Sequence, residues 1–237
     1  MNKLLKKFKH KIKLLFARLT AKIKSGPLKD YRITLLSGIG FIQGNYELEK
    51  TETILNTVNV NDIVLDVGAH IGYFTMLMSK LVGSNGHIYS FEPRPLNQKM
   101  LDKNISVNKI SNVSLSTLAI SNFTGKANFD ATTGTGTGHI SEGGNISVTV
   151  TSIDKFCNEK NIAPSFIKID IEGGEVNALK GAVHTIAKYK PKILLATHGD
   201  QLDKQCDDWM KEKGYSGKDI NQLKGDKETI WVHPENL

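Results

Sequence analysis

The sequence predicts an α/β fold: a Rossmann-like, doubly wound and mostly parallel sheet of seven strands, preceded by a basic amphipathic helix at the N-terminus. Short apolar runs alternate with segments of helical periodicity along most of the chain, which is typical of a parallel sheet covered by helices. The run Ile63–Val67 leads into a glycine-rich turn, and the run His87–Phe91 is followed by an acidic residue, Glu92. In nucleotide-binding folds of this class, ligands lie at the carboxyl ends of such strands.

Turn residues in the sequence mark where the predicted strands and helices begin and end. Residues 31–36 predict a short strand ahead of the sheet. The strands of the sheet are expected at residues 63–67, 87–91, 113–117, 166–171 and 192–197, with a final pair around 215 and 228–232. The helices are expected at residues 47–57, 71–81, 95–107, 151–160, 175–186 and 201–213. Pro95 suits the first turn of its helix, where a missing N–H costs little.

A glycine- and threonine-rich stretch, residues 132–144, lies between two further short strands expected at 126–129 and 146–150. Residues 134–138 within it alternate glycine and threonine but lack the Gly-Lys-Ser/Thr ending of a phosphate-binding P-loop. We therefore expect a loop that could cover a site as a lid.

The positive charge of the chain is concentrated at its N-terminus. Residues 1–29 contain ten of the 31 basic residues and no acidic one, so residues 30–237 contain 21 basic against 24 acidic residues. The sequence therefore divides into a basic N-terminal segment, 1–29, and a body, 30–237, with a net negative charge. Because nucleic acid attracts basic surfaces, this body is not expected to bind it.

Apolar residues in the N-terminal segment recur with helical periodicity. At about 100° per residue they share one face, and most of the lysines lie outside it. The apolar set is Leu4, Leu5, Phe8, Ile12, Leu15, Phe16, Leu19 and Ile23. The pattern predicts a helix over residues 1–24 that binds an anionic membrane surface. Docking on the body or on a partner chain, a targeting peptide and RNA binding are alternatives, although one Arg and few Ser argue against a transit peptide.

Cysteine usage and hydropathy predict a cytoplasmic protein, with the N-terminal segment as a possible peripheral attachment to a membrane. Cys157 and Cys206 show no metal-ligand spacing and are expected to be reduced thiols. No stretch is long and apolar enough to cross a bilayer. Without a secretory signal, the four Asn-x-Ser/Thr sequons are interpreted as chance occurrences. They lie at Asn104, Asn112, Asn122 and Asn145.

The turn after the first strand of the sheet indicates the cofactor. Its glycines let the backbone approach a ligand closely. A dinucleotide fingerprint needs glycine where His70 stands, because a pyrophosphate rests there. The acid-x-Gly-x-x-x-Gly pattern from Asp66 to Gly72 instead resembles motif I of class I methyltransferases, whose loop holds the amino-acid end of S-adenosylmethionine. Glu92, at the tip of the second strand, is expected to accept hydrogen bonds from both ribose hydroxyls.

Candidate catalytic residues follow the fourth and fifth strands. Asp170 and Glu172 come after the fourth strand, and His198 after the fifth. Methyl transfer to an alcohol needs an aligned hydroxyl and a proton acceptor. We expect Asp170 to face the reacting centre, and Glu172 or His198 to orient or deprotonate the hydroxyl. Helix capping by the carboxylates and a structural hydrogen bond of His198 are alternatives. A metal bridging Asp170 and a diol is chemically reasonable, but the sequence shows no complete ligand set and predicts none.

Four segments together resemble the FkbM-type methyltransferases: residues 66–73, 91–93, 119–122 and 168–175. The resemblance covers about residues 45–197, and Lys-Ile-Asp-x-Glu-Gly, from Lys168, is its most specific part. It implies a S-adenosylmethionine-dependent O-methyltransferase that acts on a hydroxyl of a sugar, a glycan or another small metabolite. The cofactor-binding residues that it implies are Asp66, Gly68, Ala69, His70, Gly72, Tyr73, Glu92, Ala119 and Asp170.

The sequence departs from this family at two positions. His70 stands where Asn is usual, and Ala196-Thr197 precede His198 where an acid is common.

One alternative function is a nicotinamide-dependent oxidoreductase, disfavoured by His70 and by the lack of a Tyr-x-x-x-Lys pair. A nucleic-acid base methyltransferase is disfavoured because no Asn-Pro-Pro-Tyr motif or Pro-Cys pair follows strand four. The third alternative is a non-catalytic, membrane-associated protein with a relic cofactor pocket.

Overall fold

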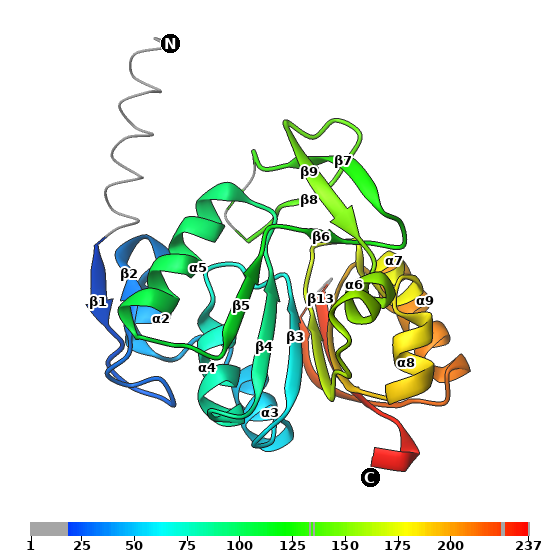
Figure 1. The fold of residues 1–237 in the computed structure, drawn as a ribbon, viewed down its shortest axis with the longest axis horizontal. Coiled ribbons are helices and arrows are strands. Elements are labelled where there is room, and N and C mark those ends of the chain that lie inside the picture. The colour runs from blue at the N-terminus through cyan, green and yellow to red at the C-terminus, as the bar shows by residue number, and fades with distance from the viewer. Residues whose placement is uncertain (1–18, 133, 135, 224–225, 237) are drawn as a thin grey trace.

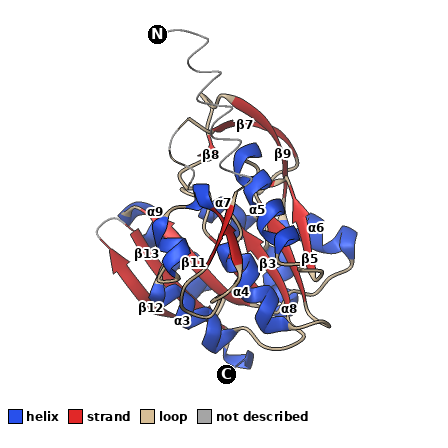
Figure 2. Ribbon diagram, turned by 90° about the vertical axis from the view of Figure 1, so that its left-hand side faces the viewer, coloured by secondary structure: helices blue, strands red, loops and turns tan. Residues whose placement is uncertain are grey.

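A large mixed sheet forms the centre of the molecule. The computed structural model describes residues 19–132, 134, 136–223 and 226–236. Among these residues the sheet has seven strands in the order β12-β13-β11-β10-β3-β4-β5, with β12 and β5 at its edges (Figure 2). The strands are β3 (Ile63–Val67), β4 (His87–Phe91), β5 (Val113–Ser116), β10 (Phe166–Ile169), β11 (Lys192–His198), β12 (Ser216–Leu223) and β13 (Asp226–Val232). The expected alternation of strands and helices is confirmed.

The register of the sheet aligns the strand ends that carry the candidate site. The five strands from β11 to β5 pair in parallel, whereas β13 runs antiparallel to both β11 and β12. Val67 lies opposite Ile169, and Ile169 opposite Leu195. The chain leaves β3 and β10 at the same level, so the turn at Gly68 and the segment from Asp170 meet at one edge. His198, the last residue of β11, reaches this edge from the neighbouring strand.

Helices cover both faces of the sheet (Figure 1). One face carries α3 (Leu48–Thr57), α4 (Tyr73–Val82) and α5 (Pro95–Val107). The other carries α6 (Ile153–Lys160), α7 (Glu175–Lys180), α8 (Val183–Tyr189) and α9 (Asp200–Glu212). Successive residues of a strand point to opposite faces, so Phe166 joins the core under the first group of helices and Ile167 joins the core under the second.

A second, four-stranded sheet lies above the carboxyl edge of the first, at the top of Figure 1. It contains the glycine- and threonine-rich stretch, residues 132–144, which runs between its second and last strands in chain order. The strands are β6 (Ala119–Ile120), β7 (Gly125–Asp130), β8 (His139–Ile140) and β9 (Ile146–Thr151), in the order β6-β9-β7-β8. Part of the expected loop is therefore a strand, because His139 and Ile140 pair with the end of β7.

The predicted N-terminal helix is wrong where the structure describes the segment. Residues 1–18 lie outside the described residues. Thr20–Lys22 forms a strand, β1, which pairs antiparallel with β2 (Arg32–Thr34). The side chain of Arg32 also donates hydrogen bonds to Thr20. Ile23 and Leu28 are buried in the main core, so residues 19–29 pack on the body. The amphipathic pattern missed this because the strand is specified by pairing across the chain, not by local periodicity.

Between β2 and α3 the chain forms two short helices, η1 (Leu35–Ser37) and α2 (Ile39–Gln43), and a final 3-10 turn, η2 (Pro234–Asn236), follows β13. Cys157 and Cys206 are both buried and free of a disulfide. In the described part of the chain, no helix has the length and apolarity needed to span a membrane.

The single helix predicted over residues 175–186 is two helices, α7 and α8. A Cβ atom at Gly181 would lie 2.2 Å from the carbonyl oxygen of Ser121, so the backbone passes close to the second sheet here. The carboxylate of Asp154 accepts hydrogen bonds from the N–H groups of His184 and Thr185, at the start of α8. A side chain from α6 thus satisfies free N–H groups that a helix start exposes, which stabilises the break.

Candidate active site

Two cavities adjoin at the carboxyl edge of the main sheet. The larger has a volume of about 410 Å³ and the smaller about 240 Å³. Their shared lining residues are Gly68, His70, Gly136, Asp170 and Glu172. The residues that sequence reasoning placed at the ends of two strands therefore form a common wall between two compartments.

The glycine turn brings β3 against the end of β10. Gly68 has a φ of 81°, and a Cβ atom there would lie 1.8 Å from the carbonyl oxygen of Asp170. The N–H groups of Gly68 and Ala69 both donate to the carbonyl oxygen of Phe91, at 3.0 and 2.9 Å. Glycine is required at position 68 because both the positive φ and the close approach exclude a side chain.

Glu92 lies in the smaller cavity and is 5% exposed. Its carboxylate accepts hydrogen bonds from the backbone N–H groups of His70, at 2.9 Å, and Arg94, at 2.8 Å. Burial raises the pKa of Glu92 to about 7, although these two hydrogen bonds favour the ionised form. Ala119 lines the same cavity. The acid at the tip of β4 therefore borders a cavity that is partly lined by apolar side chains.

His70 has a left-handed backbone, with a φ of 52°, and its side chain lines both cavities. Burial, with help from the ammonium group of Lys168, lowers the pKa of His70 to about 4, so the imidazole is neutral at neutral pH. Its Nε2 atom is buried without a hydrogen-bond partner. A neutral imidazole with a free polar atom can bind a ligand without adding charge to the site.

Asp66 and Gly72, both predicted to bind a cofactor, line neither cavity. The side chain of Asp66 is fully buried; it accepts a hydrogen bond from the Thr75 hydroxyl at 2.5 Å and lies 3.4 Å from the Lys168 Nζ atom. Asp66 therefore contacts the site indirectly, through the ammonium group of Lys168, which also pairs with Asp170. Gly72 precedes α4, where a Cβ atom would lie 2.2 Å from a methyl group of Leu101. Ala69 and Tyr73 line the larger cavity.

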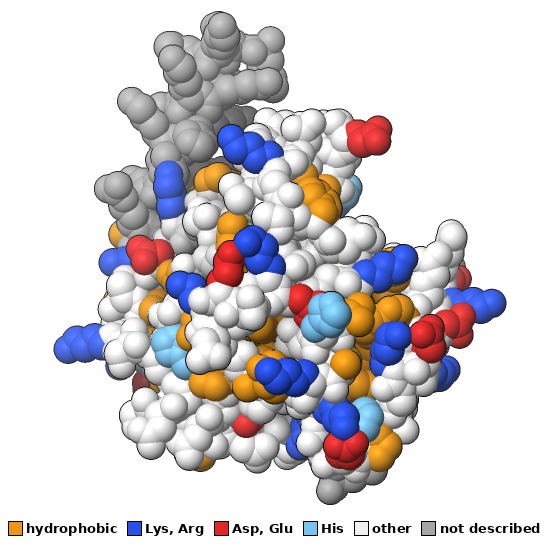
Figure 3. Space-filling model, turned by 45° about the vertical axis from the view of Figure 1, so that its right-hand side comes forward, with side chains coloured by type: hydrophobic (Ala, Val, Ile, Leu, Met, Phe, Trp, Pro, Cys, Tyr) orange, Lys and Arg blue, Asp and Glu red, His pale blue; other side chains and the backbone are white. Residues whose placement is uncertain are grey.

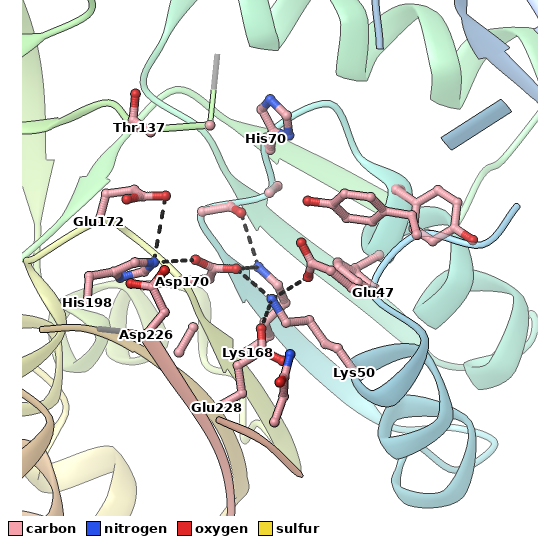
Figure 4. Close-up of a pocket in the computed structure, with 18 of the residues that line it drawn as sticks. Glu47, Lys50, His70, Thr137, Lys168, Asp170, Glu172, His198, Asp226 and Glu228 are labelled. Carbon is pink, nitrogen blue, oxygen red and sulfur yellow. Dashed lines mark hydrogen bonds and ion pairs between the residues drawn. The ribbon is translucent and has the colours of Figure 1, made fainter. Parts of the chain in front are cut away.

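Lys50 is a site residue that sequence reasoning missed. It is 3% exposed, and its Nζ atom pairs with Glu47 at 2.6 Å, Asp170 at 2.9 Å and Glu228 at 2.5 Å (Figure 4). These partners come from the start of α3, the end of β10 and the strand β13. No local sequence pattern indicates this cluster, because a lysine in a helix rich in charged residues is usually solvated.

The two buried lysines control the ionisation of Asp170. Burial alone would raise the pKa of Asp170, but the ammonium groups of Lys50 and Lys168 outweigh it and hold that pKa well below its usual range. Lys168 also donates a hydrogen bond to the carbonyl oxygen of Gly68, at 3.2 Å. The carboxylate at the wall between the cavities is thus ionised, and it is tied to the glycine turn through Lys168.

His198 lies among three carboxylates. Its Nδ1 atom is 3.1 Å from Glu175. Its Nε2 atom is 3.7 Å from both Asp170 and Glu172 (Figure 4). Burial alone would lower the pKa of His198, but the hydrogen bond to Glu175 and the nearby carboxylates raise it to about 9. An imidazolium has no lone pair to accept a proton, so in this state His198 donates hydrogen bonds and is not a base.

Glu175 is fully buried and supports both this histidine and the turn before it. Besides bonding His198, its carboxylate accepts hydrogen bonds from the N–H groups of Ile171 and Gly173. Glu172, between them, has a left-handed backbone with a φ of 58°. The ligand atoms of Asp170, Glu172 and His198 lie within 4.8 Å of one another, close enough for one metal ion.

Aromatic rings form the opposite side of the larger cavity. The rings of Phe41 and Tyr46 stack with centroids 3.8 Å apart, and Tyr73 contacts both edge-on. Phe74 completes the group and lies under the ammonium groups of Lys50 and Lys168. The Tyr73 hydroxyl is buried without a hydrogen-bond partner. The cavity thus combines flat apolar surface with polar atoms that a ligand could engage.

Sequence comparison decides the family. The profile of the methyltransferase FkbM domain matches residues 66–216. The chain belongs to the FkbM methyltransferase family. The match begins at Asp66 and takes in Gly68, Glu92, Asp170, Glu172 and His198, but not Lys50 or Glu228. A methyltransferase fold with two adjoining cavities at the carboxyl edge of its sheet agrees with this membership.

Individual relatives of this FkbM-family chain are distant. A hexuronic acid methyltransferase of Haloferax volcanii is 24% identical over 143 residues, which are 59% of this chain and 58% of the relative. The chain thus matches somewhat more than half of that protein's length. The structure of an FkbM methyltransferase from Methylobacillus flagellatus is 20% identical, with a TM-score of 0.56 over 73% of this chain and 44% of that one.

A fibrillarin from Aeropyrum pernix, solved with natively bound S-adenosyl-L-methionine, is 14% identical, with a TM-score of 0.51 over 77% of this chain and 74% of that one. At such low identities the two solved structures establish the fold alone, which is that of the class I methyltransferases.

Proposed function

We propose that this FkbM-family chain is a S-adenosylmethionine-dependent O-methyltransferase that acts on a hydroxyl of a sugar, a glycan or another small polyhydroxy metabolite. The observation that carries the proposal is the wall that Gly68, Asp170 and Glu172 form between the two cavities. Transfer between two bound molecules requires adjoining sites whose reacting groups meet at a shared boundary.

The smaller cavity fits the adenosine part of the cofactor. Glu92 directs a buried carboxylate into it, and a carboxylate at this position can accept hydrogen bonds from two vicinal ribose hydroxyls. Its wall also contains apolar side chains suited to a flat base: Leu118, Ala119, Ile120 and Phe123. The close approach of Gly68 to the end of β10 excludes a side chain at position 68 from the junction. When bound, S-adenosylmethionine supplies the methyl group.

The larger cavity fits a polyhydroxy acceptor. Its free polar atoms include the hydroxyl of Tyr73 and a carboxylate oxygen of Glu228, both buried without a hydrogen-bond partner. Carboxylates accept hydrogen bonds, so the ligand has to supply donors. The aromatic rings offer flat apolar surface on the other side. A sugar combines several hydroxyl donors with apolar C–H surface.

At the junction, the protein's own groups can hold a hydroxyl and take its proton. Asp170 is kept ionised by Lys50 and Lys168, and His198 as imidazolium donates hydrogen bonds. These groups orient the acceptor oxygen toward the smaller cavity. Carboxylates lining the larger cavity provide the proton acceptor as the oxygen is methylated.

The alternative functions have less support. The relative of Haloferax volcanii is described as a hexuronic acid methyltransferase, which favours a sugar acceptor over a nucleic acid. On the face drawn in Figure 3, basic and acidic side chains are interspersed, whereas a nucleic-acid site requires clustered basic residues. His70 fills the position at which a dinucleotide fold places glycine, and it disfavours a nicotinamide cofactor.

Isothermal titration of the full chain with S-adenosylhomocysteine, with NAD as the control, tests the proposal. We expect saturable binding of S-adenosylhomocysteine and none of NAD. The variant Glu92→Gln is expected to weaken that binding about tenfold or more, because a charged acceptor of two hydrogen bonds is lost. Binding of NAD alone would overturn the proposal.

Attachment of residues 1–18 to an anionic membrane is a separate proposal. It is supported by the lysine-rich composition of the segment. Co-sedimentation of the full chain with anionic vesicles, compared with a chain starting at Leu19, tests it; equal co-sedimentation of both would contradict it.

A further inference from the structure

Three potential metal ligands converge on the wall between the two cavities. The Nε2 atom of His198 lies 3.7 Å from a carboxylate oxygen of Asp170 and 3.7 Å from one of Glu172. One ligand atom from each residue lies within 4.8 Å of the other two. Atoms bound to a common ion at about 2.0–2.2 Å are separated by similar or slightly shorter distances. Small side-chain rotations are therefore enough to close the three around a cation.

The hydrogen bond that orients the His198 ring is of the kind found at metal-binding histidines. Such histidines almost always donate their other ring N–H to a carboxylate, which fixes the orientation of the ring. Here the Nδ1 atom is held at 3.1 Å by Glu175, whose side chain is fully buried and bonded to the backbone of Ile171 and Gly173. This arrangement directs Nε2 toward Asp170 and Glu172, as Figure 4 shows.

The charge of the surroundings provides independent support. The described residues that line the larger cavity include five carboxylates: Glu47, Asp170, Glu172, Asp226 and Glu228. The lysines of this lining are already engaged with carboxylates, since Lys50 pairs with three and Lys168 with two. Lys227, the remaining lysine, pairs with Asp203, Asp207 and Asp219, outside the lining. The cavity therefore carries excess negative charge close to His198, which a bound cation would offset.

We propose that Asp170, Glu172 and His198 bind one divalent cation of the Mg²⁺ or Mn²⁺ class, which holds the acceptor hydroxyl at the junction of the cavities. The cation displaces the Nε2 proton of His198 to solvent, because only a neutral imidazole can bind a metal. Two carboxylates and this imidazole leave the remaining coordination positions for water and for hydroxyl oxygens of the acceptor. A cation lowers the pKa of an oxygen that it binds. The proton then passes to Asp226, which lines the same cavity and is not one of the three ligands. The role of the ion rests on the proposed function, whereas its binding does not.

Titration with Mn²⁺ tests the site directly. Electron paramagnetic resonance of free Mn²⁺, or isothermal titration with Mn²⁺ alone, is performed on the full chain with and without S-adenosylhomocysteine. We expect one Mn²⁺ per chain, displaced by Mg²⁺. Glu172→Gln and His198→Ala should each weaken binding at least tenfold, as loss of a ligand does. The matched control is Asp226→Asn, which removes a carboxylate of the same cavity and should retain the ion with an affinity changed by less than about threefold.

The outcomes separate this inference from the proposed function. Absence of saturable Mn²⁺ binding at millimolar concentrations would overturn the cation site and would leave protonated His198 as the partner of the carboxylates. Binding that is unchanged in both Glu172→Gln and His198→Ala would also overturn it. Circular dichroism and S-adenosylhomocysteine binding on the same samples report on folding and on the cofactor site. Cofactor binding without Mn²⁺ binding therefore contradicts the cation site alone.

Discussion

Lys50 and Asp170 lie 120 positions apart in the sequence, and the Lys50 ammonium group donates a hydrogen bond to the Asp170 carboxylate at 2.9 Å. This pair joins α3 to the end of β10, at the wall between the two cavities. It also explains why the pKa of Asp170 is held low in a half-buried position. The helix before the first strand of the main sheet is therefore part of the site.

Replacement of Lys50 should destabilise the whole molecule. Lys50→Met would leave three carboxylates, Glu47, Asp170 and Glu228, close together without their shared cation. Removal of one partner of a buried ion cluster typically costs about 3–5 kcal/mol. Urea denaturation measures the loss in the free energy of unfolding. Lys155→Ala, which removes an exposed pair with Glu159, is the control and should change the free energy by no more than about 0.5 kcal/mol.

Cofactor affinity should depend on pH through Glu92. Burial raises the pKa of this carboxyl to about 7, and two ribose hydroxyls can both donate only to the ionised form. Affinity for S-adenosylhomocysteine should therefore rise with pH, by about tenfold between pH 6 and pH 8, and then level off. Calorimetric titration across this range measures the change. Glu92→Gln should bind more weakly at pH 8 and with little pH dependence, whereas Asp102→Asn, on the exposed side of α5, should follow the unmodified chain.

A side chain at position 68 should disrupt the junction. In Gly68→Ala the new methyl group would lie 1.8 Å from the Asp170 carbonyl oxygen, on a backbone with a φ of 81°. The turn would have to move away from β10, and we expect a loss of about 2–4 kcal/mol in stability together with loss of S-adenosylhomocysteine binding. Thermal denaturation and calorimetry measure the two effects. Gly143→Ala is the matched control, because a Cβ atom there meets nothing within 4 Å; equal effects of the two substitutions would contradict the argument.

Arg94 should hold the segment after β7 over the smaller cavity. Its guanidinium group donates hydrogen bonds to the carbonyl oxygens of Ala131, at 2.8 Å, and Gly134. Loss of these bonds in Arg94→Ala should lower the local opening free energy by about 0.5–1.5 kcal/mol per bond. The loss should appear as faster amide hydrogen exchange in the described residues of this segment, 131–132, 134 and 136–138. Lys126→Ala, on the same small sheet, should leave the exchange unchanged. Unaltered protection in Arg94→Ala would show that other contacts hold the segment.

Local sequence patterns determined most of the strands and helices. The predicted bounds of β3, β4 and α5 coincide with those of the structure, because short apolar runs bordered by turn residues specify burial and chain reversal locally. The carboxyl ends of parallel strands meet at one edge, so the sequence also predicted that Glu92, Asp170, Glu172 and His198 would lie together. The sequence also predicted that the backbone at Gly68 would approach another group closely. It did not predict that this group would be the carbonyl oxygen of Asp170.

Tertiary structure alone decided the contacts between distant segments. The strand Thr20–Lys22 overrides a helical pattern because it gains backbone pairing with β2, and Lys50 is buried because three carboxylates from separate elements surround it. Asp66 reaches the site only through Lys168, and Glu175 fixes the ring of His198. Periodicity records which face of an element is buried, but it carries no information on which charged groups from elsewhere in the chain will share that environment. Those partners set the ionisation states of Asp170 and His198, and with them the chemistry available at the site.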